Sequence, residues 1–252
     1  MRGVPVDLPP LGSLARSVAL FRSYGYEQSD PARFYSFLAA DSARQVAHYT
    51  PLTGRTLLDV GGGPGYFADA FRALGATYVG LDADAGELSL HGREVRDDMV
   101  VGSGLALPFA DAAVDVCYSS NVLEHVPDPV QMANEMVRVT KPGGLVFLSY
   151  NNWLAPNGGH ETAPWHYLGG QRAADRYARK HGRRPKNDYG VSLYRTTVAQ
   201  MLRWKDETVR AGAVEVVDVV PRYHPTWARG IVKVPALREV LTWNLLLVLR
   251  AR

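Results

Sequence analysis

Short apolar runs recur along the chain, and most are separated by stretches whose apolar residues repeat at helical spacing. After the run that begins at Thr56, for example, Phe67, Ala70, Phe71 and Leu74 recur every three or four residues, which is typical of the buried face of a helix. Strands that alternate with helices in this way predict an α/β fold with a mostly parallel sheet. The expected strands are Thr56–Leu58, Thr77–Leu81, Met99–Val101, Asp115–Ser119, Leu145–Ser149, Ala213–Val220 and Trp243–Leu249.

Local signals mark where several helices begin and end. Asp30 followed by Pro31 has the composition of an N-cap and a first helical residue, and Pro129 opens another helix with Met132 and Met136 on its apolar row. The turn at 141–144, Lys-Pro-Gly-Gly, is expected to end that helix. The other expected helices are Leu11–Phe21, Pro31–His48, Gly170–His181 and Val198–Val209.

The turn after the first strand is rich in glycine and follows an acidic residue, Asp59. Gly61, Gly63 and Gly65 permit positive φ and let a ligand approach the main chain, and the following helix offers unpaired N–H groups. A dinucleotide turn of the form G-x-G-x-x-G would require Gly or Ala at position 66, where Tyr66 is too large. The spacing therefore disfavours a nicotinamide dinucleotide.

The ordered motifs resemble the class I S-adenosylmethionine-dependent methyltransferases, and within them the methyltransferase type 11 group. An acid before G-x-G-x-G, a Leu-Pro-Phe block at 107–109 and the Lys-Pro-Gly-Gly turn carry the resemblance, which covers about residues 55–150. The chain is also similar to actinobacterial and mycobacterial members, some of which act on cell-envelope or polysaccharide hydroxyls. The resemblance implies an α/β, Rossmann-like class I methyltransferase fold: a seven-stranded, mostly parallel sheet with helices on both faces and an antiparallel last strand.

The same resemblance implies that S-adenosylmethionine is the cofactor and assigns residues to its parts. Asp82 ends the second strand where a carboxylate would bind the two ribose hydroxyls, although Asp84 competes for that role and a turn or cap aspartate is the alternative. Ser103 stands where many members place an aspartate against the adenine. The cofactor residues implied are Asp59, Gly61, Gly63, Gly65, Asp82, Ser103 and Asn121.

Asn121, Glu124 and His125 follow the fourth strand and admit two interpretations. In the family this segment lies beside the methionine part of the cofactor, whereas the Asn121–Glu124 spacing also matches a helix capping box. Some related O-methyltransferases resemble the chain in an E-x-x-E-H motif that holds Mg²⁺. Asn121 replaces the first acid here, which leaves Glu124 and His125, with His160 as a candidate third ligand, and Mg²⁺ prefers oxygen ligands.

A proton must also leave the acceptor if the methyl group goes to an aliphatic hydroxyl. His125 and His160 follow the fourth and fifth strands, at the binding edge of an open α/β sheet, so they are the candidate catalytic bases. His166 is a third candidate, and for each histidine a hydrogen-bonded packing role is the alternative.

The long connection at about 151–190 mixes aromatic, amide and histidine side chains, and long irregular connections are often functional. Trp153, Trp165, His166 and Tyr167 are its candidate substrate residues. Such a mixture suits a hydroxyl on a glycan, an oligosaccharide or another small metabolite. A phenolic, quinone or lipid acceptor, or a protein that binds the cofactor without catalysis, are the alternatives, and core aromatics would look the same.

Composition narrows the setting. The 252 residues are 46% hydrophobic, and we expect a helical cover at 1–50 and a methyltransferase domain at 51–252 with an insertion at about 151–190. Cys117 is the single cysteine, which excludes an internal disulfide and favours a reducing compartment, so we expect a cytoplasmic protein. The net charge of +3 with scattered arginines does not indicate a nucleic-acid surface, and no apolar run is long enough to span a membrane. The oligomeric state is not written in the sequence.

Overall fold

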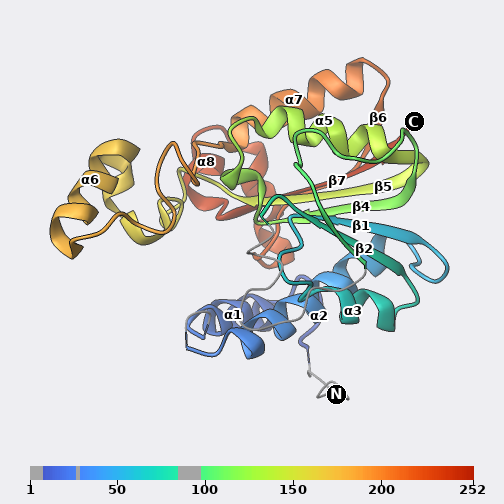
Figure 1. Cartoon of the computed structure of the whole chain (residues 1–252), viewed down its shortest axis with the longest axis horizontal. Coiled ribbons are helices and arrows are strands. Elements are labelled where there is room, and N and C mark those ends of the chain that lie inside the picture. The colour runs from blue at the N-terminus through green and yellow to red at the C-terminus, as the bar shows by residue number, and fades with distance from the viewer. Residues whose placement is uncertain (1–7, 27–28, 85–97) are drawn as a thin grey trace.

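The computed structural model describes residues 8–26, 29–84 and 98–252, so the first residues of the expected 1–50 cover lie outside it. Within these ranges the chain folds around one mixed sheet with helices on both faces (Figure 1). The strands are β1 (Thr56–Val60), β2 (Thr77–Asp82), β3 (Met99–Val101), β4 (Val114–Ser120), β5 (Thr140–Asn151), β6 (Val214–Pro221) and β7 (Asn244–Ala251).

The strand order is β3-β2-β1-β4-β5-β7-β6, and β7 is antiparallel to both of its neighbours while the other pairings are parallel. This confirms the expected seven-stranded, mostly parallel Rossmann-like sheet with an antiparallel last strand. Because β1 lies beside β4 in mid-sheet, the chain reverses its direction of strand addition there, and the carboxyl ends of β1 and β4 form the usual ligand-binding crevice of such sheets.

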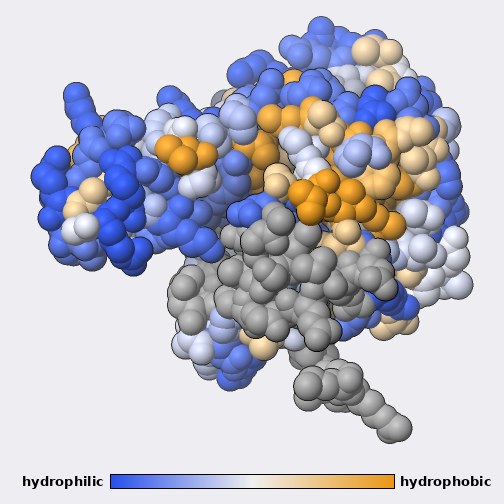
Figure 2. All heavy atoms as spheres, in the orientation of Figure 1, coloured by the Kyte–Doolittle hydropathy of each residue, from blue (hydrophilic) through white to orange (hydrophobic). Residues whose placement is uncertain are grey.

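The helices form a layer on each side of the sheet. Figure 1 shows α5 and α7 over one face and α1, α2 and α3 over the other, while α6 projects away from the body of the domain. The surface of that projection is mainly hydrophilic (Figure 2). The helices are α1 (Leu14–Tyr24), α2 (Pro31–Tyr49), α3 (Ala68–Ala73), α5 (Pro129–Val139), α6 (Gly170–His181), α7 (Val198–Arg210) and α8 (Leu237–Leu241), with short 3₁₀ segments η2 (Leu123–His125), η3 (His160–Thr162), η4 (Trp165–Leu168) and η5 (Thr226–Lys233).

Alternation along the strands divides the core into two layers. Leu57 packs with α2 and α3, and the next residue, Leu58, packs with α5 and α7 on the opposite face. Val46 of α2 is fully buried in the first of these layers, so the second half of α2 is part of the sheet's own core. A separate covering unit over 1–50 stays a prediction.

Local chemistry starts the helices where the sequence indicated. The Asp30 carboxylate accepts a hydrogen bond from the Arg33 N–H at 3.1 Å, and Asp128 does the same for the Gln131 N–H at 2.9 Å, each directly before a proline at the first helical position. The helix that Pro129 opens ends at Val139, directly before the turn at 141–144, but the turn itself differs from expectation. It lies inside β5 as an irregularity, because Val114 pairs with Thr140 and Val116 with Leu145.

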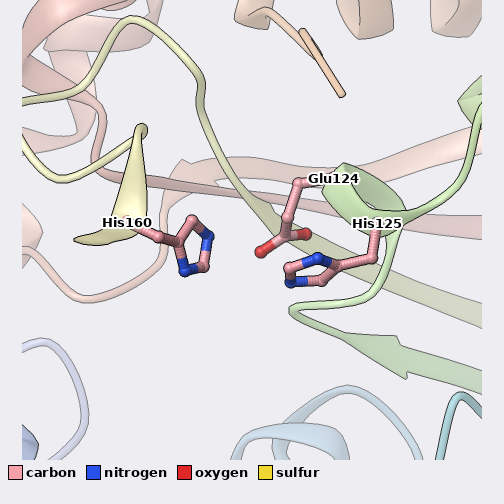
Figure 3. A group of neighbouring side chains, drawn as sticks. All are labelled: Glu124, His125 and His160. Carbon is pink, nitrogen blue, oxygen red and sulfur yellow. The ribbon is translucent and has the colours of Figure 1, made fainter. Parts of the chain in front are cut away.

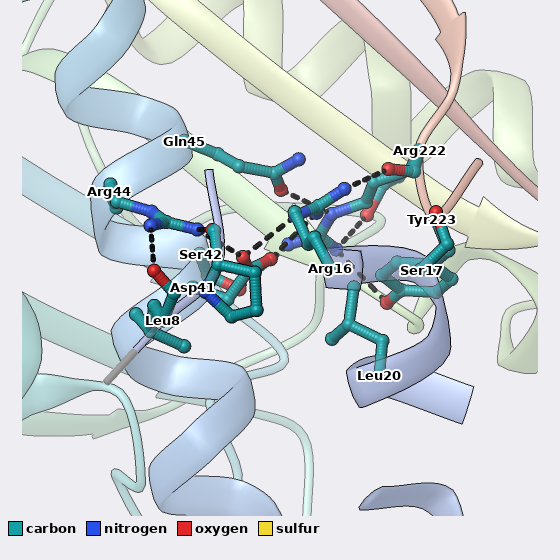
Figure 4. A network of polar contacts seen from close by, with 12 residues as sticks. Leu8, Arg16, Ser17, Leu20, Asp41, Ser42, Arg44, Gln45, Arg222 and Tyr223 are labelled. Atoms are coloured by element: carbon teal, nitrogen blue, oxygen red, sulfur yellow. Dashed lines mark hydrogen bonds and ion pairs between the residues drawn. The ribbon is translucent and has the colours of Figure 1, made fainter. Parts of the chain in front are cut away.

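A buried polar network fixes the first two helices to the sheet (Figure 4). The Arg16 guanidinium donates to both oxygens of Asp41, at 2.8 and 2.7 Å, and to the backbone oxygen of Arg222 at 2.9 Å. The Arg222 guanidinium donates in turn to hydroxyls of Ser42 on α2 and Ser149 on β5. The network joins α1, α2 and the end of β6 to the carboxyl ends of the central strands.

Candidate functional site

The glycine turn between β1 and α3 has the backbone that the sequence predicted. Gly61, Gly63 and Gly65 have φ values of +80°, +51° and +75°, which glycine adopts readily and other residues rarely do. The Gly61 N–H donates to the carbonyl of Leu81 on β2 at 2.7 Å. A Cβ on Gly61 would lie 2.4 Å from a methyl group of Val122, whereas a Cβ on Gly63 would meet no described atom within 4 Å. Gly63 therefore faces open space in the described structure, where a ligand can approach its backbone.

Two carboxylates flank this turn and have different surroundings. Asp82, at the end of β2, accepts the Gly63 N–H at 3.0 Å, so it lies beside the turn as a ribose-binding carboxylate should. Asp59 is buried and accepts the hydroxyl of Tyr78 at 2.7 Å. Burial, together with the nearby charge of Asp82, raises the pKa of Asp59 to about 7, against the lowering effect of the Tyr78 hydrogen bond. Asp59 is thus buried against the turn and hydrogen-bonded to Tyr78. Its direct contact with a cofactor stays a prediction.

Ser103 and Asn121, the other residues assigned to the cofactor, lie at strand ends. Ser103 is exposed after β3 and accepts the Leu105 N–H at 3.1 Å. Asn121 follows β4 with φ at +58°, accepts from the amide of Asn244 at 2.7 Å and donates to the Tyr223 hydroxyl at 3.3 Å. Its side chain therefore does not cap η2, which begins after Val122 without a side-chain cap. The capping-box interpretation was wrong, because tertiary contacts occupy the amide.

Glu124, His125 and His160 come together in space, as their positions after β4 and β5 predicted. Figure 3 shows the Glu124 carboxylate between the two imidazoles. One ligand atom from each residue lies within 4.8 Å of the others. The His125 Nδ1–H donates to the carbonyl of Ser192 at 2.6 Å, which leaves Nε2 of the neutral ring as an acceptor. One Glu124 oxygen accepts the Asn151 N–H at 3.1 Å.

Two buried acceptor atoms of this cluster have no hydrogen-bond partner within the described structure: the second Glu124 oxygen and Nε2 of His160. Burial lowers the pKa of His160 to about 4, and the neighbouring His125 contributes in the same direction. Burial raises the pKa of Glu124, against the effect of His125. His160 is therefore neutral at pH 7, and its backbone is left-handed, with φ at +48°. Such conformations cluster at functional sites.

A cavity of about 690 Å³ lies between α1, α2 and the ends of the central strands, and none of the three cluster residues lines it in the described structure. Asn121 and Asn151 line it from the sheet, and Phe21 and Phe34 line it from the helices. Both asparagines follow expected strands and could be found from the sequence, whereas Tyr223 and Trp243 reach the cavity from segments far along the chain and were missed.

Comparisons with known proteins agree with this geometry. Residues 58–148 match the family model described as a methyltransferase domain. An uncharacterized methyltransferase of Mycolicibacterium paratuberculosis is 54% identical over 247 residues, covering 94% of this chain and 95% of the relative. An uncharacterized methyltransferase of Mycobacterium tuberculosis is also 54% identical, over 246 residues and the same shares of both chains. A crystal structure of an S-adenosylmethionine-dependent methyltransferase from Mesorhizobium loti has a TM-score of 0.56 at 21% identity, covering 86% of this chain and 97% of that one.

The chain belongs to the methyltransferases. The glycine turn of this methyltransferase fits the cofactor, because the Gly63 backbone is open and three glycines hold conformations that a side chain would strain. Within the described ranges, no helix combines the length and the apolar composition needed to cross a membrane.

The donor set of the cluster also fits a divalent cation, since two buried acceptors lack partners and all three groups converge. Two imidazoles and one carboxylate are typical of sites for zinc, iron and other first-row transition ions, whereas Mg²⁺ prefers sets made of oxygen ligands. The arrangement therefore favours a transition ion over the expected Mg²⁺.

The four candidate substrate residues of the methyltransferase separate into two pairs. Trp153 is buried and packs at a right angle against the ring of His166, which is also buried and has Nε2 at 3.2 Å from the carbonyl of Ala155. Trp165 and Tyr167 are exposed, at 44% and 47% of their surfaces. None of the four lines the cavity in the described structure, and their contact with an acceptor stays a prediction.

Proposed function

We propose that this methyltransferase transfers a methyl group to a hydroxyl oxygen of a glycan or another small molecule. The observation that carries the proposal is the unpartnered Nε2 of His160, a neutral and buried imidazole nitrogen beside a cavity at the carboxyl edge of the sheet. A hydroxyl held beside Asn157 would lie near this acceptor, because Asn157 lines the cavity and its carbonyl accepts the His160 N–H. The single cysteine, Cys117, supports a reducing, cytoplasmic setting.

Gly61, Gly63 and Gly65 would hold the amino-acid part of the cofactor against the backbone, and Asp82 would bind its ribose. Ser103 would lie by the adenine and Asn121 by the sulfonium end. When bound, S-adenosylmethionine supplies a carbon already activated by a sulfonium leaving group, so in-line displacement by an oxygen needs mainly positioning. The protein's task is to orient the hydroxyl and to accept its proton.

His160 or His125 accepts that proton as the new carbon–oxygen bond forms and the carbon–sulfur bond breaks. The products are a methyl ether, the demethylated cofactor and a protonated imidazole, which returns its proton to water. A low pKa makes His160 a weak base at equilibrium, but it also keeps the imidazole unprotonated at neutral pH. General-base assistance of this kind contributes typically ~10²–10⁴-fold in rate.

A metal-assisted version uses the same three side chains. Glu124, His125 and His160 would hold a divalent ion, which would lower the pKa of a bound hydroxyl. The carboxylate would offset part of the cation's charge, and the backbone N–H of Asn151 orients it by a hydrogen bond to its other oxygen.

Different features support different acceptors. Exposed Trp165 and Tyr167 support a glycan, whose apolar ring faces stack on aromatic side chains. The aromatic and aliphatic lining of the cavity supports the alternative, a phenolic, quinone or lipid acceptor. A protein that binds the cofactor without transfer is a third candidate, but the convergence of Glu124, His125 and His160, two of which have a buried atom without a hydrogen-bond partner in the described structure, supports catalysis.

The test is transfer from S-adenosylmethionine labelled in its methyl group to fractionated extracts of a mycobacterium. We expect label in a product that resists mild base, because an ether survives conditions that release a methyl ester as methanol. Label released by base would indicate a carboxylate acceptor, and binding of the cofactor without any transfer would favour the non-catalytic alternative.

A further inference from the structure

The first helix buries two polar side chains beside Leu20 and leaves several apolar side chains exposed. Arg16 is 1% exposed and Ser23 is buried, whereas Leu14 and Phe21 are 60% and 67% exposed. The ion pair of Arg16 with Asp41 on α2 fixes this orientation (Figure 4). If α1 rotated to turn its apolar face toward the core, the two buried charges would be separated, which is costly. Because Arg16 is buried and Phe21 is exposed, α1 has an exposed apolar face that a ligand can cover.

The 690 Å³ cavity begins directly at this face. Val18 and Phe21 line it from α1, Leu38 lines it from α2, and Trp243 closes it with its ring 6.1 Å from that of Phe21. Arg22, which is exposed, is the single Asp, Glu, Lys or Arg among the described lining residues. The apolar part of these walls suits a hydrocarbon better than a sugar, because each sugar hydroxyl there would need a polar partner to offset its loss of water.

The inner end of the cavity is polar and adjoins the Glu124 cluster. Asn121, Asn151 and Asn157 line it there. The Asn151 N–H donates to Glu124, and the carbonyl of Asn157 accepts the His160 N–H at 2.9 Å. The side-chain oxygen of Asn157 is buried and has no hydrogen-bond partner within the described structure. A buried acceptor without a donor is matched by a ligand O–H.

We infer that the acceptor is a long-chain lipid whose hydrocarbon lies between α1 and Trp243 and whose hydroxyl lies at Asn157 and the Glu124 cluster. This rests on the proposed O-methylation and names its substrate class. A volume of about 690 Å³ falls within the range of roughly 300–1,000 Å³ that buries most of a drug-sized ligand, so it holds a substantial part of a chain. The exposed rings of Phe21 and Trp243 give the chain an apolar entrance.

The first experiment measures binding of a series of alcohols, octanol, decanol and dodecanol, to the complete protein saturated with S-adenosylhomocysteine. This complex cannot react, so the measurement reports the cavity alone. Burial of each added methylene should tighten binding by about fourfold until the cavity is filled. Alcohols that fail to bind, or affinities that do not rise with chain length, would overturn the inference.

Two variants on the same helix locate the site. Val18→Glu places a carboxylate in the cavity wall and should weaken dodecanol binding by at least about tenfold. Leu14→Glu changes an exposed residue that does not line the cavity, and it should bind dodecanol like the wild type. Unchanged affinity of both variants for S-adenosylhomocysteine shows that they are folded, and equal dodecanol binding by the two would contradict the assigned cavity.

Transfer of labelled methyl to lipid and aqueous extracts separates this inference from the proposed function. Label in the lipid fraction supports both. Label confined to the aqueous fraction overturns the lipid acceptor and leaves O-methylation standing. Absence of label from both fractions counts against the proposed function, and the alcohol series still decides whether the cavity takes a hydrocarbon.

Discussion

The imidazole rings of His125 and His160 lie 5.3 Å apart between centroids, although they follow different strands of the sheet. His125 is oriented by its hydrogen bond to Ser192, and His160 has no partner for Nε2 in the described structure. The pair can therefore contribute two ligands to one metal ion. A second histidine close by also keeps His160 from acquiring a proton at neutral pH.

Replacing His160 with alanine should lower kcat by ~10²-fold or more, because the acceptor proton loses its base or its metal ligand. The affinity for S-adenosylhomocysteine should not change, since His160 is not among the residues assigned to the cofactor. The measurement is single-turnover transfer together with calorimetric binding. His181→Ala, on the exposed end of α6, is the matched control and should behave as the wild type. If turnover survives in His160→Ala and in His125→Ala, the acceptor is already acidic, as in a phenol or a carboxylic acid.

Chelation distinguishes the two uses of the cluster. Prolonged dialysis against a chelator should remove activity if a metal is needed, and Zn²⁺ or Mn²⁺ should restore it better than Mg²⁺ because of the two imidazole ligands. Activity that persists through dialysis would leave His160 or His125 as a direct base.

Replacing Asp82 with alanine should weaken cofactor binding by about ten- to a hundredfold. This corresponds to the free energy that hydrogen bonds to a charged group typically contribute. The variant would lose the proposed ribose contact, and it lacks the acceptor of the Gly63 N–H. Gly63→Val should bind more weakly still, because its φ of +51° strains a branched residue and the side chain fills the open approach. Asp84→Ala is the control in the same turn. Undiminished binding by Asp82→Ala, measured by calorimetry, would remove the ribose assignment.

Replacing Asp59 with asparagine should stabilise the protein above pH 7. Because burial raises the folded-state pKa of Asp59 to about 7 from 3.8, the folded state holds a proton that the unfolded state releases between those values. The contribution of Asp59 to the free energy of unfolding is complete below pH 4 and is lost as the pH rises to 7. The loss is on the order of 4 kcal/mol. Asparagine still accepts the Tyr78 hydroxyl and does not ionise. Urea unfolding at pH 5 and pH 8 should show a smaller pH effect in the variant, and equal effects in both proteins would contradict the assignment.

The fold and part of the site follow from local sequence features. Apolar runs give the strands, Asp-Pro pairs start α2 and α5, and glycines at 61, 63 and 65 have the required positive φ. The meeting of Glu124, His125 and His160 was also predictable, because β4 and β5 are adjacent parallel strands whose carboxyl ends share one edge.

The orientation of α1, the cavity wall and the burial of each tryptophan depend on long-range contacts, which local sequence patterns do not predict. The inward turn of α1 is set by Arg16, whose partner Asp41 is 25 positions away and whose carbonyl partner at Arg222 is 206 positions away. The cavity wall at Trp243 depends on where the antiparallel β7 begins. Aromatic composition alone did not distinguish buried Trp153 from exposed Trp165, since either suits a core or a binding surface.

These two tryptophans should therefore respond differently to alanine. Trp153→Ala should lower the free energy of unfolding by ~3–5 kcal/mol, because it empties a site packed between His166 and Tyr189. Trp165→Ala removes an exposed ring that carries the Arg176 guanidinium at 4.0 Å, and it should cost less than ~1 kcal/mol. If the segment at 151–167 recognises the acceptor, Trp165→Ala should raise KM without changing cofactor affinity. A folded Trp165→Ala enzyme with wild-type KM would remove Trp165 from the substrate residues.

The buried ion pair that orients α1 gives the last prediction. Arg16→Leu leaves the fully buried Asp41 carboxylate without its main partner, and removal of one member of a buried pair typically costs ~3–5 kcal/mol. Arg44 lies 3.3 Å from Asp41 and should reduce this loss toward the lower end. The double change Arg16→Leu with Asp41→Leu removes both charges and should recover most of the stability, as measured by urea unfolding. Because α1 forms a wall of the cavity, Arg16→Leu should also weaken dodecanol binding while leaving the glycine turn, and so S-adenosylhomocysteine affinity, unchanged. Equal unfolding free energies for Arg16→Leu and the double variant would show that the unpaired carboxylate is not the cause.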